Sequence, residues 1–177
     1  MLLIGPSAAI GEALVPRLLR QSDEVRVVEE DAGLAATWAA LGAHVARGSR
    51  SDADLVERAA QNVRTIVVMP RPGDDAVELL SAVVDGATHA SPSMRIVVCA
   101  SHVDASVASV VKDSGLDHVV LRTGAKLGGF LPLTVERVPA TALAEAIDAA
   151  DDLPGSPKLD LDLTVRGSWG ALHLSAP

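Results

Sequence analysis

The first residues that could do chemistry form a short glycine-bearing turn, GPSAAIG, over residues 5–11. The turn follows an apolar run at residues 2–4 and precedes a stretch with apolar residues at helical spacing. Such a turn presents backbone N–H groups and the positive end of a helix, which together suit a pyrophosphate. Gly5 would make the turn, Gly11 would let helix and strand pack closely, and Ala8 replaces the middle glycine of the full pattern. We expect a dinucleotide to bind here; the alternative is a turn that holds no ligand.

An acidic residue follows the second apolar run, at residues 25–28. Glu29 lies 18 residues after Gly11, where a carboxylate can accept hydrogen bonds from an adenosine ribose. A carboxylate at this point would repel a 2′-phosphate, so Glu29 favours NAD over NADP. A solvated acidic loop over residues 29–31 is the alternative interpretation.

Two more sets of polar residues follow predicted strands, at the edge where doubly wound sheets bind their ligands. Arg71 comes after the run at residues 65–69 and is a candidate partner for a cofactor phosphate or a substrate anion, or else a solvent-facing loop arginine. Ser101 and His102 come after residues 95–100. The serine could hydrogen-bond a substrate oxygen, and the histidine could transfer a proton near neutral pH. The alternative for this pair is a polar loop without a catalytic role.

The elements that would position these residues alternate along the chain. Apolar runs that predict strands are followed by stretches of helical periodicity, and the runs lie at residues 2–4, 25–28, 44–46, 65–69, 95–100 and 118–121. A continuously apolar run is typical of a parallel strand that is buried on both faces. We therefore predict an α/β fold, Rossmann-like and doubly wound, with a mostly parallel sheet in the order 3-2-1-4-5-6 and helices on both faces.

The later part of the chain follows a looser pattern. Residues 123–139 are typical of a long loop, often a lid or a binding loop, and residues 140–150 of a helix. Residues 159–165 alternate apolar and polar side chains, which predicts an edge strand with one wet face. Residues 166–177 form a C-terminal tail that we expect to dock on its own domain or on a second copy in a homodimer. Because no linker divides the sequence, we expect a single domain over residues 1–177.

The composition narrows the classes of function. The 177 residues include 15 basic and 23 acidic side chains, a net charge of −8, which disfavours binding to nucleic acid or to an anionic membrane. No apolar stretch approaches the ~18 residues of a membrane span, no signal peptide is recognisable, and the histidines show no metal-binding spacing. The lone Cys99 lies in an apolar run, which indicates a core residue in a reducing compartment. We expect a cytoplasmic protein.

Several segments, taken in order, resemble one family. They are LLIGPSAAIG at the start, then GAHVARGSRSDADLVERAAQNVRTIVVM, then RIVVCAS and DSGLDHVVLRTG, and finally PATALAEAIDAA. Their order and spacing are similar to those of the atypical short-chain dehydrogenase/reductases, in the NAD(P)H-binding group that includes NmrA-like proteins. The resemblance covers about residues 1–163. It implies a Rossmann fold, a dinucleotide and an unknown small-molecule substrate as partners, and oxidoreductase ancestry.

The sequence departs from this family at the residues that carry out carbonyl reduction. Members that reduce carbonyls use a Tyr-x-x-x-Lys pair, in which the tyrosine exchanges a proton with the substrate oxygen and the lysine lowers its pKa. This sequence has no tyrosine, and Ala108 stands four residues before Lys112. The family's acidic residue after the third strand is Ser49 here, and its Arg-Pro-Gly after the sixth strand is Arg-Thr-Gly, residues 122–124.

The turn, the strand ends and the resemblance together give a set of candidate residues for binding NAD or NADP: Gly5, Ser7, Ala8, Ala9, Ile10, Gly11, Glu29, Ser49, Met69, Arg71, Ala100, Arg122 and Gly124. Ser101 and His102 are the candidate catalytic residues. Three functions stay open. The chain could be an NAD(P)(H)-binding redox sensor or accessory protein without Tyr/Lys chemistry. It could be an oxidoreductase that uses His102 or Ser101, or whose substrate needs no tyrosine. It could also be a cofactor-free module that forms oligomers.

Overall fold

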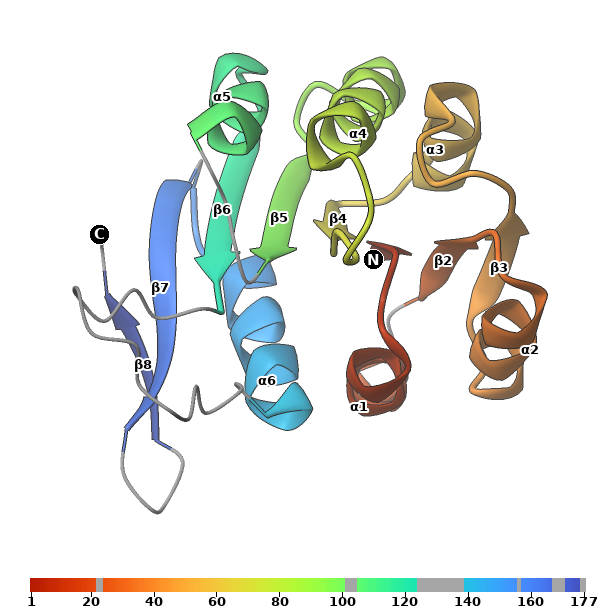
Figure 1. The fold of residues 1–177 in the computed structure, drawn as a ribbon, viewed down its shortest axis with the longest axis horizontal. Coiled ribbons are helices and arrows are strands. Elements are labelled where there is room, and N and C mark those ends of the chain that lie inside the picture. The colour runs from red at the N-terminus through yellow and green to blue at the C-terminus, as the bar shows by residue number, and fades with distance from the viewer. Residues whose placement is uncertain (22–23, 101–104, 124–138, 156, 167–170, 176–177) are drawn as a thin grey trace.

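The computed structural model of the chain describes residues 1–21, 24–100, 105–123, 139–155, 157–166 and 171–175 (Figure 1). Strands and helices alternate along these residues. The strands are β1 (Leu2–Ile4), β2 (Arg26–Glu29), β3 (His44–Arg47), β4 (Thr65–Val68), β5 (Arg95–Ala100), β6 (Asp117–Arg122), β7 (Lys158–Arg166) and β8 (Ala171–Ser175). The helices are α1 (Ala8–Arg20), α2 (Ala32–Ala40), α3 (Ala53–Ala60), α4 (Ala76–Ala90), α5 (Ala105–Asp113) and α6 (Ala140–Asp151).

All the described strands form one sheet, in the order β3-β2-β1-β4-β5-β6-β7-β8. Every pair from β3 to β7 is parallel, and only β7 and β8 are antiparallel. The predicted order 3-2-1-4-5-6 is therefore confirmed. The strand order reverses between β1 and β4, and in sheets of this kind a crevice opens beyond the carboxyl ends of the strands at that point.

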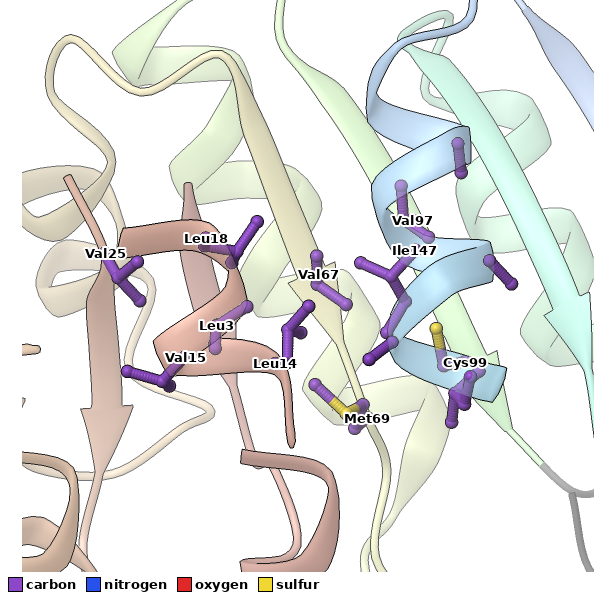
Figure 2. Packing of buried hydrophobic residues seen from close by; sticks show 14 of the residues in the cluster. Leu3, Leu14, Val15, Leu18, Val25, Val67, Met69, Val97, Cys99 and Ile147 are labelled. Carbon is purple, nitrogen blue, oxygen red and sulfur yellow. The ribbon is translucent and has the colours of Figure 1, made fainter. Parts of the chain in front are cut away.

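Helices cover the sheet on both faces, as predicted. Helices α1, α2 and α6 lie on one face and α3, α4 and α5 on the other (Figure 1). Alternate residues of each buried strand supply the two apolar layers, so that Leu3 packs towards α1 while its neighbours Leu2 and Ile4 pack towards α3 and α4. Figure 2 shows the first layer, with Ile147 of α6 against Val97 of β5. No described helix has the length and the hydropathy that crossing a bilayer requires.

The last strands differ from the sequence prediction. Residues 159–165 do form a strand, β7, but β7 lies between β6 and β8, so the prediction that it is an edge strand is wrong. The reason is the tail, in which residues 171–175 form β8 and pair antiparallel with β7. Strict alternation predicts a strand with two unlike faces, but it does not tell whether a further strand pairs beside it.

Helix α6 is fixed to the sheet at the amino ends of β4 and β5. The buried guanidinium of Arg95 donates hydrogen bonds to four carbonyls at the end of α6, with N···O distances of 2.9 Å to Ala150, 2.6 Å to Asp151, 2.8 Å to Leu153 and 3.2 Å to Gly155. The carboxylate of Asp151 in turn accepts hydrogen bonds from Arg64 and from the buried hydroxyl of Thr65. A positive charge at a helix C-terminus also favours the helix dipole.

Candidate functional site

The turn between β1 and α1 requires a glycine at its first position. Gly5 has a φ of +71°, and a Cβ built there would lie 2.7 Å from the carbonyl oxygen of Met69, at the end of β4. A side chain at this position would therefore be strained and would also collide with backbone. The predicted role of Gly5 in making the turn fits this geometry, and the same contact brings the predicted site residue Met69 against the turn.

The start of α1 is open to solvent. Ser7 is its N-cap, and the Ser7 Oγ accepts the Ile10 N–H at 3.4 Å. Ser7, Ala8 and Ala9 are exposed, and Ile10 is half-buried. The first N–H groups of a helix have no partner within the helix, so an exposed N-terminus can bind an anion. Because Ala8 is exposed, its methyl group does not close this surface.

Gly11 is buried, but its close contact differs from the expected one. A Cβ at Gly11 would lie within 3.0 Å of two ring atoms of Trp38 and 3.1 Å from a third, Cε3. Trp38 belongs to α2 and is completely buried. The glycine therefore lets α1 approach α2 at the tryptophan ring. The three nearest atoms therefore belong to a helix, whereas the expected close contact is with a strand.

Glu29 is the last residue of β2, and its side chain is completely buried. Its Oε2 accepts a hydrogen bond from Arg71 Nη2 at 2.5 Å, and its Oε1 accepts from the Asp31 N–H at 3.1 Å and from Arg71 Nη1 at 3.3 Å. Burial raises the pKa of Glu29, but the hydrogen bonds from Arg71 and Asp31 and the charge of Arg71 outweigh it, so this pKa lies below its usual value. Both sequence interpretations of Glu29 require an accessible carboxylate; the structure makes it a buried counter-ion.

Arg71 reaches from the loop after β4 across the glycine turn. Its Nε donates to the Gly5 carbonyl at 3.3 Å, and its Nη2 donates to the Pro6 carbonyl at 3.0 Å as well as to Glu29. The side chain keeps 23% of its surface exposed. The reading of Arg71 as a solvent-facing loop arginine is wrong, because its guanidinium lies against the turn. Its role as a partner for an anion stays a prediction.

A second arginine, Arg50, lies beside the turn and was missed by the sequence analysis. It follows β3, is buried, and forms a two-pronged ion pair with Asp74, with Nη1 to Oδ2 at 2.8 Å and Nη2 to Oδ1 at 3.0 Å. Nη2 also donates to Glu30 at 3.0 Å. The Asp74 Oδ2 accepts the backbone N–H of Arg71 at 2.7 Å. Asp74 therefore connects Arg50, in the segment after β3, to the loop after β4.

The charges around this network nearly cancel. Burial raises the pKa of Asp74, but the hydrogen bonds from Arg50 and from the Arg71 backbone, with the charges of both arginines, hold it below its usual value. Two guanidinium groups thus face three carboxylates, those of Glu29, Glu30 and Asp74. A hollow of about 180 Å³ opens beside them, lined in part by Glu30, Arg50 and Asp74. This hollow lies beyond the carboxyl ends of β2, β3 and β4, the same ends of the strands at which the glycine turn lies.

A larger hollow, of about 240 Å³, lies at the opposite ends of the strands, where β1, β2 and β4 begin. Its lining includes Arg26, Arg64, Thr65 and Asp151. These side chains bond to one another or to nearby backbone, as in the anchoring of α6 described above. We regard this hollow as part of the framework, because no predicted site residue lines it.

The other candidate residues are spread along the strand ends. Ser49 is exposed, and its Oγ accepts the Ser51 N–H at 3.3 Å. Ala100 ends β5, is buried, and its carbonyl accepts the Thr123 N–H at 3.0 Å. Ser101, His102 and Gly124 lie outside the described residues.

Arg122 ends β6, and its guanidinium bonds away from the glycine turn. Its Nη2 donates to Asp160 Oδ2 at 3.3 Å, and Lys112 Nζ donates to the same oxygen at 2.6 Å. Burial raises the pKa of Asp160, but hydrogen bonds from Lys112 and Arg122 and their charges bring it below its usual value. Lys112, the lysine without a tyrosine partner, is thus half of a structural ion pair across α5 and β7. Among the described residues, no three potential metal ligands gather.

The strand order, with its reversal between β1 and β4, and the glycine turn that opens α1 together define a Rossmann-type α/β fold. By sequence, no protein-family model and no curated protein matches this chain. By structure, it is similar to anaerobillin reductase ChuY from Escherichia coli O157:H7, with a TM-score of 0.71 at 19% identity over 91% of this chain and 94% of that one.

Two further solved structures have the same fold. A triphenylmethane reductase from Citrobacter sp., complexed with NADP(H), gives a TM-score of 0.69 at 15% identity over 90% of this chain and 68% of that one. An NADPH-dependent quinone oxidoreductase from Escherichia coli, complexed with NADPH, gives 0.69 at 16% identity over 88% and 66%. At 15–19% identity these likenesses show the fold, so the Rossmann fold implied by the resemblance stated from the sequence is confirmed.

Proposed function

We propose that this protein binds NAD(P)(H) in the crevice between β1 and β4, with the dinucleotide's pyrophosphate at the exposed start of α1. The observation that carries this proposal is the turn itself, in which Gly5 is obligatory and Ser7, Ala8 and Ala9 are exposed at a helix N-terminus. The fold neighbours crystallised with NADP(H) and NADPH support the same assignment.

We propose further that the protein does not reduce ordinary ketones and serves as a redox sensor or accessory protein. NAD(P)H supplies a hydride when bound, but a carbonyl oxygen then needs a proton from a group held within hydrogen-bond reach. The sequence has no tyrosine, and Lys112 is engaged with Asp160. Loss of a positioned proton donor costs about 10²–10⁴-fold in rate.

A second candidate function is a reductase whose acceptor needs no tyrosine. The names of the fold neighbours favour it, because anaerobillin, triphenylmethane and quinone reductases act on acceptors other than simple ketones. In this reading Ser101 or His102, in the segment after β5, would contact the substrate.

The experiment begins with mass spectrometry of the natively purified protein, for bound NAD, NADP or another ligand. Calorimetric titrations with NADH and NADPH follow, and then a panel of ketones, quinones and imines with the wild type and His102→Ala. We expect dinucleotide binding and no ketone turnover. Turnover of quinones or dyes that is lost in His102→Ala, with cofactor affinity retained, would favour the second function. Absence of any dinucleotide binding would leave the cofactor-free module.

We also propose that the protein forms a homodimer through the outer edge of β8. The alternating strand and the apolar tail suggest such an interface from the sequence. Among the described strands, β8 rather than β7 lies at that end of the sheet. An open strand edge can pair with the same edge of a second copy. Light scattering at working concentration tests this, and a monomer mass would contradict it.

A further inference from the structure

The group that a bound adenosine would meet after β2 is an arginine rather than the acidic residue of the sequence pattern. In doubly wound folds the residue at the end of β2 contacts the adenosine ribose. Here that residue, Glu29, is completely buried, and both of its oxygens accept hydrogen bonds from Arg71 or from the Asp31 N–H. A ribose hydroxyl cannot reach a carboxylate that is covered and satisfied in this way.

The covering group is itself accessible. Arg71 keeps 23% of its side chain exposed and lies between the end of β2 and the glycine turn, where it bonds Glu29 on one side and the Gly5 and Pro6 carbonyls on the other. Its backbone is fixed by Asp74, which is held in turn by Arg50. The guanidinium is therefore positioned from two directions before any ligand arrives.

A phosphate and a hydroxyl differ in what they offer to this guanidinium. The contact with the Gly5 carbonyl is long, at 3.3 Å, and its acceptor is neutral. A 2′-phosphate carries close to two negative charges near pH 7 and forms shorter, stronger bonds with arginine, so it can replace a carbonyl acceptor. A ribose 2′-hydroxyl carries no charge and gains little by the same exchange. Pairing with Arg71 also weakens the repulsion that Glu29 would exert on a phosphate.

We propose that Arg71, with Glu29 as its buried counter-ion, is the specificity-determining residue of the dinucleotide site and selects the 2′-phosphate of NADP(H) over the 2′-hydroxyl of NAD(H). This proposal rests on the proposed function, since it assigns the recognition of one part of the same ligand. It reverses the preference expected from the sequence. The reason is that the carboxylate at the end of β2 and the guanidinium from the loop after β4 come together from positions 42 residues apart.

The test is calorimetric titration of NADPH and NADH into the wild type, Arg71→Ala, Arg71→Lys and Glu29→Gln. Arg20→Ala is the matched control, because it removes the same charge from an exposed position at the far end of α1. Circular dichroism and thermal unfolding check that each variant is folded. Arg71→Lys keeps the charge and loses the planar fork, so it stays informative where Arg71→Ala does not fold.

We expect the wild type to bind NADPH at least tenfold more tightly than NADH. Arg71→Ala should weaken NADPH binding by about 10- to 100-fold, the worth of one charge-assisted hydrogen bond, and change NADH binding less than threefold. Arg71→Lys should fall between, and Arg20→Ala should leave both within about threefold. Glu29→Gln should weaken NADPH binding more than NADH binding, because the guanidinium of Arg71 loses the carboxylate that positions it.

Two results would overturn the proposal. A tenfold loss of NADH affinity in Glu29→Gln would mean that the carboxylate contacts the ribose after all. An equal loss of both ligands in Arg71→Ala would mean that the arginine attracts the pyrophosphate without reading the ribose. If neither dinucleotide binds the wild type, the proposed function itself fails, and that outcome is distinct from the other two.

Discussion

Gly11→Ala tests whether the glycine after the turn serves packing or the ligand. An added Cβ would lie within 3.0 Å of two atoms of the buried Trp38 ring, closer than a methyl group and a ring carbon can approach. The ring has no room to retreat, so the cost lies at the upper end of that for overpacking, about 3 kcal/mol. Alanine recovers about 1 kcal/mol of helix propensity relative to glycine.

The net expectation for Gly11→Ala is a loss of about 2 kcal/mol of unfolding free energy, or roughly 4–8 °C in melting temperature for a chain of this length. The assay is urea unfolding followed by far-ultraviolet circular dichroism. The cycle is completed by Trp38→Leu and by the double variant. When the ring is absent, only the propensity gain remains, so Gly11→Ala should be neutral or stabilising in the Trp38→Leu background.

Two results would refute this reasoning. A neutral Gly11→Ala in the wild-type background would mean that the α1–α2 contact is looser than described. A penalty that persists without the tryptophan would point to a different neighbour, such as the strand that the sequence pattern suggested. A third readout separates packing from binding: the folded Gly11→Ala protein should bind its dinucleotide within about threefold of the wild type, because Gly11 is buried behind the turn.

The remaining predictions concern charge. Because Glu29, Asp74 and Asp160 have pKa values below their usual 4.5, 3.8 and 3.8, their contribution to stability is present above those values and is lost as the pH falls below them. Unfolding free energy measured by urea titration should therefore decline below pH 4.5, and Glu29→Gln should flatten the upper part of that decline; a flat wild-type profile would contradict it. Arg95→Met should cost about 3 kcal/mol or more, because it leaves carbonyls at the end of α6 buried without a donor. A loss below about 1 kcal/mol in urea unfolding would mean that water replaces the guanidinium.

The order of the strands could be predicted from the sequence because it depends on local patterns. Runs such as residues 96–100 are apolar throughout, and each is separated from the next by a helical stretch. Parallel strands buried on both faces leave few other arrangements. The position of β8 could not be predicted, since five residues near the end of a chain carry no signal for the strand beside which they add.

The candidate site was predictable in place but not in chemistry. Gly5 and the start of α1 follow from the turn alone. The roles of Glu29 and Arg71 depend on each other, and neither residue indicates its partner from a distance of 42 positions. Arg50 was missed for the same reason. In a Gly-Ser-rich turn an arginine is typical of the surface, and its burial depends on Asp74 and Glu30 from two other loops.

The anchoring of α6 determines when its part of the sheet can finish folding during synthesis. Thr65 and Asp151 are 86 residues apart, so at about 5–20 residues per second the ribosome adds the aspartate roughly 4 to 17 s after the threonine. During that interval β4 and β5 are made before α6. The apolar face that α6 will cover is still bare, and the guanidinium of Arg95 still lacks its carbonyl acceptors. A nascent chain at this stage exposes apolar surface of the kind that chaperones bind. The arrival of one helix then covers the apolar surface and satisfies the arginine together, before β7 and β8 are made and added to the sheet.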